Sequence, residues 1–159
     1  MANWEERIRG FWLEASDVDA DAILGSMQLL VAERHDDDPA AIYEWASVQD
    51  FLGREAEAIP LYRRALVLGL DPVRRSQALI QLASSLRNVG ETTEAIRILE
   101  GIGHDATVGD AGEAFLALSL FDAGRPGDAL RVALTALGKT LPLYGGVVEK
   151  YADAIVDPK

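Results

Sequence analysis

The two histidines of the chain, with the acids beside them, are the side chains best suited to metal binding or proton transfer. His35 precedes Asp36, Asp37 and Asp38 in ERHDDDP, and imidazole and carboxylate groups are competent ligands for divalent metals. Adjacent residues on one short segment cannot readily converge on a single ion, and a hydrated linker that caps a helix beginning near Pro39 explains the same acids. We therefore predict no metal and no cofactor. A metal- or ligand-dependent regulator built around His35 is the weakest of three functional hypotheses.

The patterns of nucleophilic and phosphate-binding enzymes are missing. His104 lies beside an acid in a glycine-rich turn and has no nucleophile partner near it in the sequence. The same turn, GIGHDATVG, lacks the Lys followed by Ser or Thr of a phosphate-binding loop and follows no predicted strand. The candidate serines fall within predicted helices, away from any strand-to-helix nucleophile turn; they are Ser84, Ser85 and Ser119. The sequence predicts a non-enzymatic protein.

Composition narrows the class of partner. The 159 residues include no cysteine, and the formal net charge is -11. Disulfides and thiolate chemistry are thereby excluded, and nucleic acid is an unfavourable partner because such binding depends on Lys and Arg neutralising phosphates. The acidic excess lies mainly in residues 1–38. No basic segment with an apolar run opens the sequence and no 18-residue uncharged stretch occurs, so we expect no secretory signal, no membrane span and a cytoplasmic location.

The elements that carry these residues repeat along the chain. Gly53, Gly90 and Gly124 are separated by 37 and 34 residues, and an alanine stands five residues after each of them. Apolar residues before and after each glycine recur at i, i+3, i+4 and i+7, the stripe of a helix that buries one face. A glycine in the left-handed conformation is a common way to end a helix. Each unit is therefore predicted to be a helical hairpin, and a period in the thirties is typical of stacked helical arrays.

These units resemble the tetratricopeptide repeat. Ala46, Ala83 and Ala117 match the small position of its first helix, the alanines at 58, 95 and 129 match that of its second, and Tyr62 matches its aromatic. The departures are Ile42, Leu79 and Glu113 for the tryptophan, Gln49 for the tyrosine and Leu70 for the closing proline. The stretch DDDPAAIYEWASVQDFLGREAEAIPLYRRAL, with ALIQLASSLRNVG after it, is similar to a bacterial group-five family of small tetratrico peptide repeat proteins.

The resemblance implies an all-α fold, a right-handed α-α superhelix or solenoid of helical hairpins with capping helices at both ends. We predict a single domain over residues 1–159, with a degenerate N-terminal hairpin at 1–38, repeats at 39–72, 73–104 and 105–138, and a C-terminal capping helix within 139–159 that runs from Pro142 to Val156. Its stripe of Leu143, Val147, Val148, Tyr151 and Ile155 should cover the last repeat. Pro60, inside the second helix of the first repeat, should lie on the solvated side, since an interior proline removes one helix hydrogen bond.

The resemblance also implies a concave groove, lined by the first helices of the repeats, that grips a protein or peptide partner. Carried over by spacing from the glycines, the groove candidates are Tyr43, Ser47, Asp50, Phe51, Ile80, Ser84, Arg87, Asn88, Ala114, Leu118 and Phe121. This set lacks the Lys, Arg and Asn residues with which some repeats of this type clamp a C-terminal carboxylate.

Two apolar patches are candidates for a homo-oligomer interface. The segment AGEAFLALSLF is apolar on more than one face, and either the C-terminal helix covers it or a second copy does. The first helix carries the other patch. Together the interface candidates are Trp4, Phe11, Trp12, Phe115, Leu118 and Phe121. The arginines at 63, 64, 74 and 75 form either a solvated face that balances Glu55 and Glu57 or a basic edge that docks an acidic segment, such as the N-terminal segment of another copy.

These observations favour a protein-binding scaffold or adaptor acting as a homodimer, a function implied by the family resemblance. The alternative is a self-assembling structural protein whose groove is filled by its own chain or by a second copy.

Overall fold

The computed structural model describes residues 3–15, 19–103 and 105–156. In these ranges the chain forms nine helices and no strand, which confirms the predicted all-α architecture. Each of these helices is too short or too polar to cross a bilayer. The helices are α1 (Trp4–Glu14), α2 (Ala20–Val31), α3 (Pro39–Phe51), α4 (Glu55–Leu68), α5 (Pro72–Asn88), α6 (Thr92–Glu100), α7 (Ala111–Asp122), α8 (Pro126–Thr140) and α9 (Gly145–Asp153).

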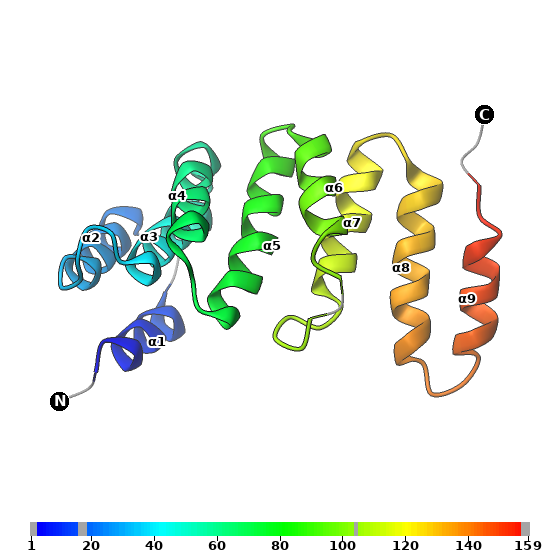
Figure 1. Cartoon of the computed structure of the whole chain (residues 1–159), viewed down its shortest axis with the longest axis horizontal. Coiled ribbons are helices and arrows are strands. Elements are labelled where there is room, and N and C mark those ends of the chain that lie inside the picture. Colours follow the sequence, from blue (N-terminus) through cyan, green and yellow to red (C-terminus); the bar gives the residue numbers. More distant parts are fainter. Residues whose placement is uncertain (1–2, 16–18, 104, 157–159) are drawn as a thin grey trace.

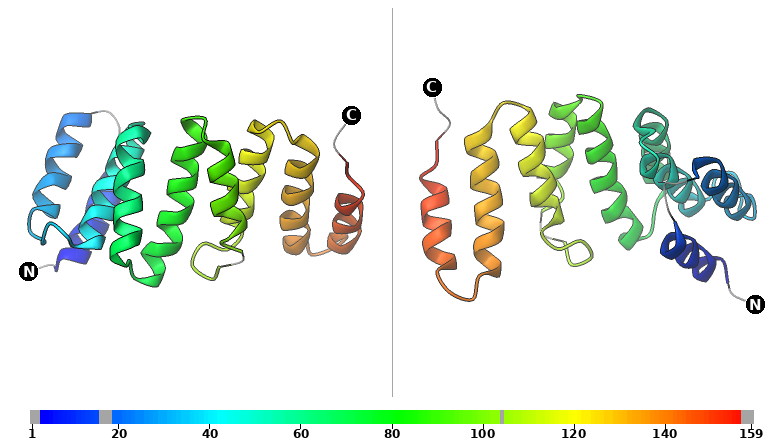
Figure 2. Two further views of the ribbon diagram at one scale, coloured as in Figure 1. Left: turned by 45° about the horizontal axis from the view of Figure 1, so that its top comes forward. Right: turned by 180° about the vertical axis from the view of Figure 1, so that it is seen from behind.

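The helices follow one another along the long axis of the molecule, and the two ends of the chain lie at opposite ends of the array (Figure 1). Each helix packs against the next one in sequence, and α5 also contacts both α3 and α7. Figure 2 shows α5 to α9 standing side by side in two further views. This is the arrangement of stacked helical hairpins, in which the first helices of neighbouring hairpins touch.

The hairpin turns form as the glycine pattern predicts. Gly53, Gly90 and Gly124 have φ values of 69°, 88° and 74°, a region where a side chain is strained. In each turn the N–H of the next residue donates to the carbonyl five residues earlier, as in Arg54 N to Gln49 O (2.9 Å). This bond satisfies a carbonyl that the helix end would leave free.

One of the acids in the 36–38 segment, Asp38, caps a helix. The Asp38 side chain accepts hydrogen bonds from the backbone N–H groups of Ala40 and Ala41, and Pro39 occupies the first position of α3. Asp71 and Pro72 do the same for α5. The first helices of the first two repeats, α3 and α5, therefore begin at an Asp-Pro cap that is visible in the local sequence.

The core consists of three clusters along the array. The largest lies between α3 and α6 and includes Tyr62, which is fully buried, and the alanines 46, 58, 83 and 95, which are also fully buried. A second cluster joins α1, α2 and α3. The third, between α6 and α8, has only Ile96, Leu120 and Ala129 as buried members. Apolar burial thus declines toward the C-terminal end.

Pro60 is exposed in α4, as expected for a proline whose missing hydrogen bond lies on the solvated side of the helix. The loss of one ladder hydrogen bond is tolerated because Ile59 and Tyr62, on the opposite face, are buried.

The prediction for the C-terminal helix is wrong in its bounds and in part of its stripe, although α9 packs on α8 of the last repeat and Val148 and Ile155 are half-buried. Tyr144 adopts a left-handed conformation with φ 67°, and α9 begins only at Gly145. Leu143 therefore lies outside the helix and is 71% exposed, while Val147 and Tyr151 are 49% and 69% exposed. Ala152 is the fully buried residue of α9.

Candidate functional site

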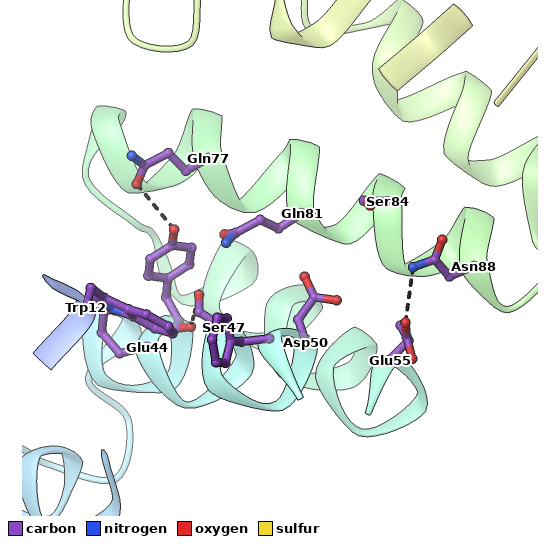
Figure 3. Close-up of a pocket in the computed structure, with 11 residues that line it drawn as sticks. Trp12, Glu44, Ser47, Asp50, Glu55, Gln77, Gln81, Ser84 and Asn88 are labelled. Atoms are coloured by element: carbon purple, nitrogen blue, oxygen red, sulfur yellow. Dashed lines mark hydrogen bonds between the residues drawn. The ribbon is translucent and has the colours of Figure 1, made fainter. Parts of the chain in front are cut away.

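A cleft with a volume of about 560 Å³ lies between α3 and α5, the first helices of two adjacent hairpins. Figure 3 shows side chains from the two helices pointing toward each other across it. On α5 the lining positions 77, 81, 84 and 88 follow helical spacing, so they form one row along that helix. The lining residues are Trp12, Tyr43, Glu44, Ser47, Asp50, Phe51, Glu55, Gln77, Gln81, Ser84 and Asn88.

Two hydrogen bonds join the walls of the cleft. Near one end the hydroxyl of Tyr43 donates to Gln77 Oε1 (3.2 Å). Near the other, Asn88 Nδ2 donates to Glu55 Oε1 (3.1 Å), as Figure 3 shows. Burial raises the pKa of Tyr43 to about 12, so this hydroxyl stays a donor at neutral pH. The first bond joins α3 to α5 and the second joins α5 to the start of α4, so the walls are tied on either side of the central part of the cleft.

Asp50 lies in that central part. Its Oδ1 accepts from the hydroxyl of Ser85 (2.8 Å) and its Oδ2 from that of Tyr62 (3.4 Å). Burial raises the pKa of Asp50, the two hydroxyls oppose the rise, and the nearby charge of Glu55 adds to it. A carboxylate has about four acceptor positions, so Asp50 retains acceptor capacity beyond these two donors.

Glu44 forms the wall near Trp12 and is only 4% exposed. Trp12 Nε1–H donates to its Oε2 (2.8 Å), and Arg74 Nε donates to its Oε1 (3.2 Å). Burial raises the pKa of Glu44, against the lowering effect of both donors. Arg74 also pairs with Glu5 and Asp71. Burial opposes its charge, but these partners outweigh burial and raise the pKa of the guanidinium.

Six of the predicted groove residues line this cleft, namely Tyr43, Ser47, Asp50, Phe51, Ser84 and Asn88. The others do not. Ile80 is 6% exposed and belongs to the core, so it cannot contact a partner there. Arg87 pairs with Asp122 (Nε to Oδ2, 2.6 Å). Ala114, Leu118 and Phe121 are exposed on α7, outside the cleft.

Sequence reasoning missed five lining residues: Trp12, Glu44, Glu55, Gln77 and Gln81. The polar row on α5 carried a usable signal, because 77, 81, 84 and 88 share one helical face and all are polar. Trp12 carried none, since nothing in the spacing of the repeats places α1 against the cleft.

The interface candidates of the first helix are not free. Trp4 is 8% exposed, and its Nε1–H donates to Leu30 O (2.9 Å). Phe11 and Trp12 pack against the cluster that joins α1 to α3, with their rings 5.0 Å apart in an edge-on contact. The amphipathic stripe of α1 therefore packs mainly on its own chain, and Phe11 and Trp12 remain half-buried.

The apolar helix α7 keeps an open side. Phe115 packs against the main core, but Leu118 and Phe121 are 47% and 65% exposed. α9 packs on α8 instead of covering these two side chains. The expectation that the C-terminal helix covers them is wrong, because α8 stands between α7 and α9 in the row (Figure 1).

Three of the four arginines at 63, 64, 74 and 75 pair within the chain, with acids other than those expected. Arg63 pairs with Glu94 and Arg64 with Asp37. Arg74 pairs with Glu5, which belongs to the acidic N-terminal segment of the same chain. Among the described residues no ion pair joins these arginines to Glu55 or Glu57.

In the described part of the chain, no group of three or more His, Asp or Glu side chains is placed to hold a metal ion. His35 is exposed, Asp37 pairs with Arg64 and Asp38 caps α3. His104 lies outside the described residues.

The stacked hairpins, the glycine turns and the cleft between first helices define a helical-repeat protein. A family model described as tetratrico peptide repeat matches residues 39–155. The chain belongs to this tetratrico peptide repeat family, in agreement with the resemblance of the repeats. Neither the curated proteins nor the solved structures gave a significant match.

Proposed function

We propose that the protein is a non-enzymatic scaffold that binds a polypeptide segment in the cleft between α3 and α5. The cleft itself carries the proposal, since it lies between the first helices of adjacent repeats and is lined by residues from both. Repeats of this family typically mediate protein binding, and the lining mixes aromatic, amide and carboxylate side chains that suit a peptide.

Peptide selection tests this proposal. The purified protein is used to select binders from a displayed random peptide library, and binding of the selected peptides is mapped by NMR. We expect Ser84→Trp, which fills the cleft, to abolish binding. Val67→Trp is the matched control, because Val67 is 87% exposed on α4 and does not line the cleft. A library that gives no binder, or binders indifferent to Ser84→Trp, would refute the proposal.

We propose in addition that the protein acts as a homodimer through the open side of α7. Two large apolar side chains, Leu118 and Phe121, stay exposed there, and a twofold interface between identical patches is the commonest way in which soluble proteins associate. Burial of apolar surface would supply the driving force.

Molar mass measured by light scattering over a concentration range tests the dimer. We expect the parent protein and the control Val67→Glu to be dimers, and Phe121→Glu to be a monomer, because the interface would have to desolvate the new carboxylate. A parent that is monomeric at every concentration would exclude this interface and, with it, the self-assembling alternative.

A further inference from the structure

We propose that the cleft between α3 and α5 takes a lysine or arginine side chain of a bound foreign polypeptide, with the carboxylates of Asp50 and Glu55 as its partners. This inference rests on the proposed peptide-binding function and names the chemistry of the partner. Three observations carry it: the charge of the lining, an unfilled acceptor, and the aromatic residues beside the carboxylates.

The charge of the lining is one-sided. Three carboxylates line the cleft, those of Glu44, Asp50 and Glu55, and no Lys or Arg lines it. Glu44 is neutralised from behind by Arg74. Among the described residues no cation pairs with Asp50 or Glu55; their partners are hydroxyl and amide groups. A positively charged group between them would remove their mutual repulsion, which at present adds to the rise in the pKa of Asp50.

The cleft also holds an acceptor without a donor. Gln81 is one of its lining residues, and the side-chain oxygen of Gln81 is buried with no hydrogen-bond partner. A buried polar atom of this kind is costly unless a ligand or water supplies the missing bond. Ammonium and guanidinium groups are donors only, so they can supply hydrogen bonds to this oxygen and to the remaining acceptor positions of Asp50.

The apolar part of a long cationic side chain has a place as well. Phe51 and Trp12 line the same cleft, with ring centroids 5.9 Å apart, and Phe51 is 43% exposed. Methylene stems of Lys and Arg pack on such rings while their charged ends reach polar groups, and the cation gains from the ring faces. The net charge of -11 attracts a basic segment from a distance.

The selected peptides supply the first test, since Lys or Arg should be enriched in them relative to the unselected library. The best binder is then synthesised with both ends capped, and each Lys or Arg is replaced in turn by norleucine and by Glu. At one of these positions we expect norleucine to lower the affinity of the peptide about tenfold, because the hydrogen-bonded charge is lost while the apolar stem remains. Binding by the Lys peptide should weaken as salt is raised.

Variants of the protein locate the contact. Asp50→Asn should weaken binding of the parent peptide about tenfold and should hardly change binding of the norleucine peptide. Glu55→Gln should weaken binding of the parent peptide about two- to fivefold, since Glu55 is partly solvated. Glu57→Gln is the matched control, because Glu57 is an exposed acid on the same helix as Glu55 and does not line the cleft. All three substitutions preserve side-chain shape, and NMR spectra of the free variants verify the fold.

The outcomes separate this inference from the function on which it rests. Peptides that bind in the cleft, as judged by Ser84→Trp, but carry no essential Lys or Arg would overturn the inference and leave the function intact. An Asp50→Asn variant that binds like the parent would overturn it too. Failure of all peptides to bind in the cleft would remove both. A change in molar mass on Asp50→Asn would show that a second copy occupies the cleft, and would overturn a foreign occupant.

Discussion

Replacing Arg74 should destabilise the N-terminal half of the array, because this arginine neutralises a buried carboxylate. The Arg74 side chain is 16% exposed, and it is the cation that pairs with Glu44, whose side chain is 5% exposed. Arg74→Met keeps an apolar stem in place and removes the charge. Glu44 is then left as a buried carboxylate with the Trp12 indole as its remaining donor.

The magnitude follows from the burial of Glu44. Removing one partner of a buried ion pair costs about 3–5 kcal/mol, because the other charge stays desolvated. The indole N–H of Trp12 offsets part of this, so we expect a loss of about 2–4 kcal/mol at neutral pH. Arg75→Met, next along the same helix and exposed, should cost below about 0.5 kcal/mol. Adding Glu44→Gln to Arg74→Met should recover more than half of the loss.

The pH dependence gives a second, independent signature. Burial already raises the pKa of Glu44 above its ordinary value of 4.5, and loss of Arg74 raises it further. A group whose pKa is raised in the folded state stabilises fully below the unfolded pKa, and that contribution is lost as the pH rises through the folded pKa. The deficit of Arg74→Met should therefore be largest at neutral pH and shrink as the pH falls toward about 4.

Urea unfolding followed by tryptophan fluorescence measures this effect directly. All three tryptophans, at 4, 12 and 45, belong to the cluster that joins α1 to α3, so the signal reports the region that Arg74 holds. If Arg74→Met unfolds like Arg75→Met, or if its deficit does not shrink in acid, then Glu44 does not depend on Arg74 and the account of this wall of the cleft is wrong.

Two further substitutions test the C-terminal contact and the central carboxylate. Gly145→Ala should destabilise the docking of α9 by about 1–3 kcal/mol, because the new Cβ would lie 2.3 Å from the carbonyl oxygen of Gly138. The control Gly146→Ala meets no heavy atom within 4 Å and should be neutral or stabilising. Hydrogen exchange over α9 distinguishes the two variants, and equal exchange would contradict the contact between Gly138 and Gly145. Burial raises the pKa of Asp50 above 3.8, so the contribution of this carboxyl group to stability declines as the pH rises. The stability of Asp50→Asn relative to the parent should therefore increase from pH 4 to pH 7. Urea midpoints of both proteins at the two pH values measure this, and an equal change in the two midpoints would count against it.

The repeat was predictable because each of its signals is local. A glycine turn, an alanine at a close helix contact and an aspartate cap are decided within a few residues, and Gly53, Ala58 and Asp38 take the conformations and burial that their residue types favour. The same locality made half of the cleft predictable, since Tyr43, Ser47 and Asp50 share one face of one helix.

The remainder depends on how separate elements dock. Trp12 reaches the cleft because α1 crosses toward α3, and no period in the sequence encodes that crossing. The start of α9 is set by the left-handed Tyr144 and by the close approach of Gly138 to Gly145, a contact between helices. Burial of Ile80 in the main core likewise reflects packing between helices, which spacing from a glycine does not register.

The distribution of buried polar residues supports a site in the first two repeats. The buried polar or charged residues of the described chain are Glu44, Ser47, Gln49, Ser76, Ser85 and Ser119, and all but Ser119 lie on α3 and α5. Apolar residues of similar volume would stabilise these positions at least as well. Departures from the most stable packing concentrate where a protein binds or reacts. The polar layer beneath the cleft, with Ser85 and Tyr62 holding Asp50 in place, is the support that a preorganised binding site requires, whereas the apolar open side of α7 has no such layer and suits association.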